Sequence, residues 1–162
     1  LSAVSAVPIL DMVQEAVDAV RRLQTRPVLP GRGRMGPIGR VGLLATTGTI
    51  RSGVYDRRLE AAGLSAVVPD DAAQRDLVMA AVFGPQGIKA GRLDDRNRAL
   101  LKQAADRLVD DGAQAIAAAC TEVPLVVRQG DLAVPLIDTL DCLARAVVNR
   151  ALGASDSTKG VG

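Results

Sequence analysis

The sequence predicts an α/β fold with a mostly parallel sheet. Stretches with the character of buried strands alternate with stretches of helical spacing, and most of the connections between them are short. The chain of 162 residues is 48% hydrophobic, yet it holds one Phe, one Tyr and no Trp. A core of Ala, Val, Leu and Ile suits parallel strands and closely packed helices. The length suffices for one domain with a substantial core.

Short apolar runs bounded by turn residues are the expected strands. A first run near the start of the chain predicts the end of a buried strand, and four later runs predict the rest of the sheet. These runs are residues 6–10, 41–45, 64–69, 113–120 and 134–138.

The expected helices follow the strands, and their apolar residues recur at helical spacing. Gly63 is placed to end one of them as a C-terminal cap, and Asp70 and Asp71 suit the start of the next. The expected helices are residues 12–23, 51–63, 70–83, 92–112, a short one over 121–130 that ends at Gly130, and 139–152.

The organisation along the chain is predicted from these elements. Residues 1–23 form a strand and helix, and residues 24–40, rich in Pro, Gly and Arg, form a linker. The main α/β domain then covers residues 41–133, a further strand and helix cover 134–152, and 153–162 form a flexible tail. "VPILDM" near the start and "VPLIDT" near the end are similar, either by chance or because they mark two equivalent halves.

Composition and charge disfavour several functions. The net charge is +2, and the one basic cluster has no aromatic residue for stacking on bases, so nucleic-acid binding is not expected. No apolar run reaches the roughly 18 to 20 residues that span a bilayer, so no membrane partner is expected. With two Cys and no His, the chain lacks a disulfide framework, Cys-x-x-Cys, the His-dependent triads and most zinc sites. We expect no metal and a reducing, cytoplasmic location.

Three candidate groups fall at the carboxyl ends of expected strands, where open α/β sheets bind ligands. The first is "TTGT", with Gly48 allowing a close turn and Thr46, Thr47 and Thr49 adding hydroxyls beside helix amides. It predicts a site for a carboxylate or phosphate, unless the threonines only cap the helix.

The second group is Cys120 in "AACTEVPLVV", at the end of a strand and before a helix whose first turn includes Pro124. Free amides there would lower the pKa of the thiol and favour a reactive thiolate. Thr121 could hydrogen-bond, and Glu122 could cap the helix or orient its neighbours. The alternative is a small buried cysteine without chemistry.

The third group is Lys89, and a second thiol belongs to Cys142. Lys89 lies between glycines in "GPQGIKAG" and is either simply solvated or a counter-charge for an acidic substrate. Cys142 lies within an expected helix, and a packing role is the better interpretation.

Together, these motifs resemble the aspartate/glutamate racemase family of cofactor-independent amino-acid racemases. The resemblance runs from about Val7 to Leu152 and rests on "VGLLATTGTIRSGVY", "IKAG", "AACTEVPLVV" and "VPLIDT". It implies a Rossmann-like three-layer α/β domain of the racemase type, no cofactor and a homodimer. Family members place two such domains across a cleft, with one cysteine on either side of the substrate.

The resemblance also assigns roles to residues of this chain. Cys120 would be the acid/base of the second domain, transferring a proton at the α-carbon of aspartate or glutamate. Lys89 would pair with the distal carboxylate of the substrate. The remaining substrate-binding residues would be Thr46, Gly48, Thr49 and Thr121, supported by Glu122. Such a site would stabilise a carbanion with amides and cations.

The sequence departs from the family in the first domain. The Cys-Asn-Thr-Ala-His-like motif with the first catalytic cysteine has no counterpart here, so the chain is expected to begin after it, and residues 1–23 to be a remnant of that domain. Racemisation by two bases would then be incomplete in this chain. The alternatives are a decarboxylase-like relative with one cysteine, or an inactive protein that binds a dicarboxylate or pairs with another subunit through an exposed apolar face.

Overall fold

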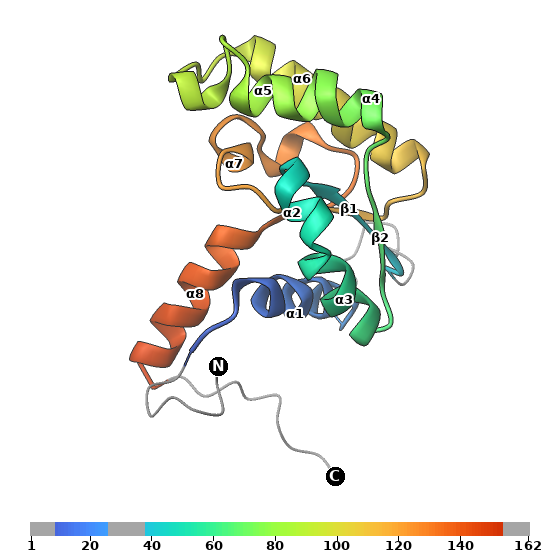
Figure 1. Cartoon of the computed structure of the whole chain (residues 1–162). Helices are drawn as coiled ribbons and strands as arrows, with labels where there is room; N and C mark the ends of the chain where they lie inside the picture. The colour runs from blue at the N-terminus through green and yellow to red at the C-terminus, as the bar shows by residue number, and fades with distance from the viewer. Residues whose placement is uncertain (1–8, 26–37, 154–162) are drawn as a thin grey trace.

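The computed structural model describes residues 9–25 and 38–153 and confirms the predicted fold class. A sheet of four parallel strands in the order β2-β1-β3-β4 has helices on both faces (Figure 1). The predicted linker and tail fall mostly on residues 26–37 and 154–162, which lie outside the described residues.

The first strand has its predicted length but begins one residue earlier, and the other three are shorter than their apolar runs, because those runs continue into turns and helix starts. Register pairs Val41 with Ala115, and Ala118 with Asp138. The strand expected at 6–10 lies partly outside the described residues, and Ile9 and Leu10 are not in a strand. The strands are β1 (Arg40–Leu44), β2 (Ser65–Val67), β3 (Ala115–Ala118) and β4 (Leu136–Asp138).

Most helices form where helical spacing predicts them, with changes at their ends. The segment at 70–83 contains a π-helical turn that the sequence pattern does not reveal. The short helix expected to end at Gly130 ends at Val126 instead. The helices are α1 (Met12–Thr25), α2 (Thr47–Ser52), α3 (Val54–Ala61), α4 (Asp71–Ala73), α5 (Ala80–Phe83), α6 (Asp95–Asp110), α7 (Val123–Val126) and α8 (Thr139–Ala151), with a π-helix η1 (Gln74–Met79) and 3-10 turns η2 (Ile88–Ala90) and η3 (Gln129–Asp131).

The core has two halves, one on each face of the sheet. Side chains alternate along a strand, so in β3 Ile116 and Ala118 pack against η1, α5 and α6, while Ala115 and Ala117 pack against α1 and α3. In Figure 1 α4, α5 and α6 lie above the sheet and α1 and α3 below it. Cys120 continues the alternation on the α5–α6 side.

The expected helix at 51–63 begins earlier and is divided. Thr46 caps α2, and Gly53, with φ +61°, ends α2 and begins α3. The predicted cap at Gly63 is confirmed: its φ is +74°, and Leu64 N–H donates to the Leu59 carbonyl at 2.9 Å. A residue with a Cβ is strained at such positive φ angles, which explains the two glycines.

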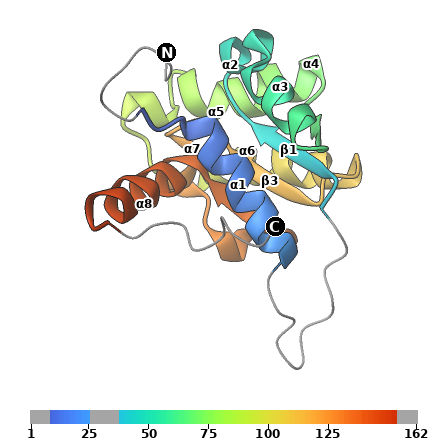
Figure 2. The same ribbon diagram turned by 90° about the horizontal axis from the view of Figure 1, so that it is seen from below.

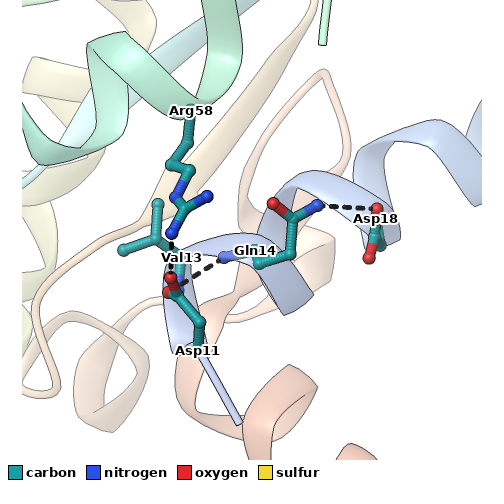
Figure 3. A network of polar contacts seen from close by, with 5 residues as sticks. All are labelled: Asp11, Val13, Gln14, Asp18 and Arg58. Atoms are coloured by element: carbon teal, nitrogen blue, oxygen red, sulfur yellow. Dashed lines mark hydrogen bonds and ion pairs between the residues drawn. The ribbon is translucent and has the colours of Figure 1, made fainter. Parts of the chain in front are cut away.

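Asp11 begins α1 and joins it to α3 (Figure 3). Its Oδ1 accepts hydrogen bonds from the N–H groups of Val13 at 2.9 Å and Gln14 at 3.2 Å, as an N-cap does. Its Oδ2 accepts from Arg58 of α3 at 2.6 Å. One carboxylate therefore caps the start of α1 and links it to α3, while buried Val13, Val17 and Val20 pack the helix under the sheet.

Helix α8 packs on α1 with one face and leaves the other exposed. In Figures 1 and 2 it extends away from the sheet. Three apolar side chains on it, and that of the C-cap residue Leu152, are about half exposed or more: Leu140 47%, Val147 50%, Val148 54% and Leu152 77%. These side chains leave an apolar surface of α8 uncovered by the described residues. We call Leu140, Val147, Val148 and Leu152 the α8 face. None of the helices in the described segments is both long and apolar enough to cross a membrane.

Candidate functional site

A single carboxylate gathers three of the predicted site residues at the carboxyl end of β3. Glu122 Oε2 accepts hydrogen bonds from Cys120 Sγ at 2.9 Å and from Thr121 Oγ1 at 3.0 Å, and Oε1 forms an ion pair with Lys89. Glu122 makes no side-chain bond to the start of α7, so of its two predicted roles it orients its neighbours and does not cap the helix. We call Cys120, Thr121, Glu122 and Lys89 the thiol cluster.

The pKa of Cys120 is raised to about 11, so the predicted lowering is wrong. Burial of the sulfur is the largest cause, and the adjacent Glu122 carboxylate, which accepts the S–H bond and repels a thiolate, is the next. The expected effect of nearby amides is present but smaller. Cys120 is therefore a thiol near neutral pH in this arrangement.

The pKa of Glu122 is lowered to about 2 by the hydrogen bond from Cys120, by Lys89 and by Thr121. The side chain is only 16% exposed, and its three donors replace the lost water. Glu122 thus remains a carboxylate, and the thiol cluster contains one negative charge beside one positive charge.

Lys89 lies in η2, in the connection between α5 and α6, and its ammonium is 5.3 Å from the centre of the Phe83 ring. The side chain is 44% exposed, so it is neither a free solvated lysine nor a buried one. Its pKa is raised, with the Glu122 bond as the largest cause. A ligand carboxylate that binds Lys89 would have to compete with Glu122, which is already paired with its ammonium group.

Residues 46–49, "TTGT", follow the neighbouring strand β1, and we call them the threonine turn. Thr46 Oγ1 accepts from the Thr49 N–H at 3.4 Å and lies 3.1 Å from Thr49 Oγ1, so it caps α2. Gly48 lies inside α2 without positive φ, and a Cβ there would meet only Thr46 Oγ1, at 4.0 Å. The turn itself therefore does not require glycine, and the space beside Gly48 is open.

The sheet brings the two groups to one edge. β1 and β3 are adjacent and parallel, with Leu44 paired to Ala118, and the Ala119 N–H donates to the Leu44 carbonyl at 3.0 Å. Thr46 and Cys120 follow two residues after these partners. Thr46 and Thr49 bond to each other and Thr47 Oγ1 accepts from Gln74, so the hydrogen bonds of these three threonines do not reach Cys120.

Two buried polar residues at this edge were not singled out from the sequence. Gln74 Nε2 donates to the Ala45 carbonyl at 3.0 Å and to Thr47 Oγ1 at 3.3 Å. Thr139 Oγ1 donates to the Ala118 carbonyl at 2.9 Å. The sequence contains a feature that could have identified each of them. Gln74 occupies the apolar helix face that continues with Leu77 and Val78, and Thr139 directly follows a predicted strand.

The second thiol lies on the other side of the molecule's core. Cys142 is half-buried on α8 and packs with the α1–α3 half, whereas Cys120 packs with the α5–α6 half. Burial raises the pKa of Cys142. Tyr55 is buried in the α1–α3 half near Thr139, and burial is the largest cause of its raised pKa. Its hydroxyl has no hydrogen-bond partner among the described residues. The described segments contain no group of three or more Cys, Asp or Glu side chains that could hold a metal ion.

These features define an α/β protein with a thiol, a carboxylate and an ammonium group at the carboxyl edge of a parallel sheet. Residues 1–147 match the Asp/Glu/Hydantoin racemase family. The chain belongs to this family, as the resemblance of its motifs predicts.

Solved structures share the fold. An Asp/Glu racemase candidate from Yersinia pestis is 26% identical with a TM-score of 0.75, and the match covers 93% of this chain and 59% of that one. An aspartate racemase homologue from Pyrococcus horikoshii OT3 is 23% identical with a TM-score of 0.71, covering 91% and 57%. The aspartate racemase of Picrophilus torridus is 23% identical with a TM-score of 0.65, covering 91% and 55%.

A curated relative is similar over part of its length. An uncharacterised protein from the pnlA 3′ region of Pectobacterium carotovorum subsp. carotovorum is 36% identical over 90 residues, which is 56% of this chain and 57% of the relative. This chain thus spans less than two thirds of each of these proteins.

Proposed function

We propose that this edge of the sheet binds an acidic amino acid and that Cys120 transfers a proton at its α-carbon, in a racemase or epimerase reaction. The observation that carries the proposal is the thiol cluster, in which Glu122 holds Cys120, Thr121 and Lys89 together in a member of the racemase family. An ammonium group beside a thiol suits a substrate that is both an anion and a carbon acid.

The raised pKa of Cys120 favours one role in this reaction. A protonated thiol is a donor, so Cys120 would deliver its proton to the substrate carbanion, and its thiolate would then take a proton from the next substrate or from water. Thr46, Gly48, Thr49 and Thr121 would bind the α-carboxylate, and Lys89 the distal one. The carboxylate of the substrate would compete with Glu122 for Lys89.

Inversion also needs a group that removes the proton from the opposite face. Cys142 does not fit this role, since it packs on the other half of the core. We propose that the second acid/base group comes from outside the described residues, on another domain or another subunit.

Deuterium exchange at the α-carbon tests the proposed function. The purified chain is incubated with L-aspartate or L-glutamate in D₂O and the Cα proton is followed by NMR, with Cys120→Ser as the test variant and Cys142→Ser as the matched control. We expect exchange in the unchanged chain and in Cys142→Ser, and none in Cys120→Ser. Exchange that persists in a folded Cys120→Ser variant would refute the role of the thiol.

A second candidate function, a subunit that pairs with a copy of itself, is favoured by the α8 face. Exposed apolar surfaces of this kind mark sites of association. We expect light scattering to give a mass above the 16.8 kDa of one chain, and Val148→Asp to lower it toward that value. Leu93→Ser is the control, because Leu93 is equally exposed but lies away from α8. A stable monomer with an unchanged α8 face would count against pairing.

A further inference from the structure

Three polar or charged residues are buried within the described segments, and each of their side chains donates hydrogen bonds to backbone carbonyls. These residues are Gln74, Asn97 and Thr139, which are 8%, 0% and 2% exposed. Burying a polar group costs free energy unless it is hydrogen-bonded. The places at which these three side chains are buried therefore indicate which backbone segments they hold. All three hold segments from which the candidate site is built.

Gln74 holds the end of β1. Its Nε2 donates to the carbonyl of Ala45, the residue before the threonine turn, and to Thr47 Oγ1. Its Oε1 is shielded from water and has no partner among the described residues. Leaving a buried acceptor unpaired destabilises the folded state. Gln74 also begins η1, a π-helical turn of the kind that often marks functional sites.

Thr139 holds the end of β3. The Ala118 carbonyl that accepts its hydroxyl belongs to the last residue of that strand, two positions before Cys120. Thr139 directly follows β4, so this bond extends the pairing of β3 with β4 by one step beyond Asp138.

Asn97 holds the connection that carries Lys89. Its Nδ2 donates to the carbonyl of Gln86 at 2.7 Å and to that of Arg92 at 2.9 Å. These two carbonyls lie on either side of η2, which contains Lys89. One side chain on α6 therefore closes the loop at both ends.

We propose that Gln74, Asn97 and Thr139 are positioning residues that fix the threonine turn, Lys89 and Cys120 relative to one another. Each acts through the backbone that precedes or flanks a site residue. The proposal rests on the proposed function for the identity of the ligand, but the geometry can be tested without any ligand.

The test measures how fast iodoacetamide alkylates Cys120, by mass spectrometry and as a function of pH, with Cys142 as a second thiol in the same molecule. Gln74→Met, Asn97→Leu and Thr139→Val remove the donors with little change in volume, and Thr139→Ser keeps the hydroxyl. Gln114→Ala is the control, because Gln114 Oε1 accepts from the N–H groups of Gly39 and Arg40 at the opposite end of β1.

We expect each of the three apolar variants to change the alkylation rate of Cys120 by about threefold or more, equivalent to half a pKa unit. Thr139→Ser and Gln114→Ala should react like the unchanged chain. If Thr139→Val or Asn97→Leu fails to fold, Thr139→Ser and Gln74→Glu are compared instead, with a change expected only in Gln74→Glu.

The proposal would be overturned if the three apolar variants fold, with lower stability, and Cys120 in them is alkylated at the rate of the unchanged chain. An equal change of rate in Gln114→Ala would also overturn it. Alkylation requires no substrate, so a negative result there refutes the positioning role alone. Absence of deuterium exchange would instead refute the proposed function.

Discussion

Glu122→Gln is expected to increase the alkylation rate of Cys120 at about pH 8 by about tenfold or more, because a fall of one pKa unit gives tenfold more thiolate. The carboxylate of Glu122 raises the pKa of Cys120 both as acceptor of the S–H bond and as a nearby negative charge. Glutamine removes the charge and keeps the size of the side chain. Lys89, released from its ion pair, would then favour the thiolate further.

The pH profile makes the direction of this effect measurable. In the unchanged chain the rate should rise with pH until the thiol titrates at about 11. In Glu122→Gln the same rise should occur at lower pH. Burial, the largest cause of the raised pKa, persists in the variant, so the profile should not return fully to that of a free thiol.

Asp131→Asn is the matched control for Glu122→Gln. Asp131 also has a lowered pKa, through Arg98 and the Arg128 N–H, but it makes no contact with Cys120. Its loss should leave the alkylation profile unchanged. Coincident profiles for Glu122→Gln and the unchanged chain would show that the carboxylate does not control the thiol.

Gly84→Ala is expected to lower the free energy of unfolding by about 1 to 3 kcal/mol, as overpacking of a rigid site does. A Cβ at Gly84 would lie 2.4 Å from the Ala80 carbonyl oxygen. This oxygen belongs to the backbone of α5 and cannot turn aside as the end of a side chain can. The main chain must therefore shift.

The shift should also reach the thiol cluster. The Gly87 N–H donates to the Gly84 carbonyl at 2.8 Å, and the Ala90 N–H donates to Gly87 at 3.0 Å, so these bonds lead from Gly84 to the turn that holds Lys89. We expect Gly84→Ala to alter the alkylation of Cys120 as well as stability.

Urea denaturation of Gly84→Ala and Gly130→Ala separates the clash from the general effect of adding a methyl group. Gly130 lies in η3, and a Cβ there meets nothing within 4 Å. Gly130→Ala should therefore stay within about 0.5 kcal/mol of the unchanged chain. Equal stabilities for the two variants would contradict the predicted clash.

Much of the site could be predicted from strand ends. The apolar runs and the alternation of strands with helices predicted the parallel sheet, and this placed Thr46 and Cys120 at the same edge. The family motif selected Thr121, Glu122 and Lys89 beside them. Gln74 and Thr139 could not be identified from the sequence. A polar residue within an apolar pattern is recognised as buried only when its hydrogen-bond partner is known, and here the partners are the distant carbonyls of Ala45 and Ala118.

The sequence by itself determined the fold class, the family and the segments that carry the candidate site, because these depend on local spacing and on short motifs. Only the tertiary structure decided the state of Cys120. The α5–α6 connection places Lys89 on Glu122 across 33 positions of the chain, and burial under the same elements removes water from the sulfur. Both effects depend on which distant groups meet, so the thiol predicted to be acidic has a raised pKa.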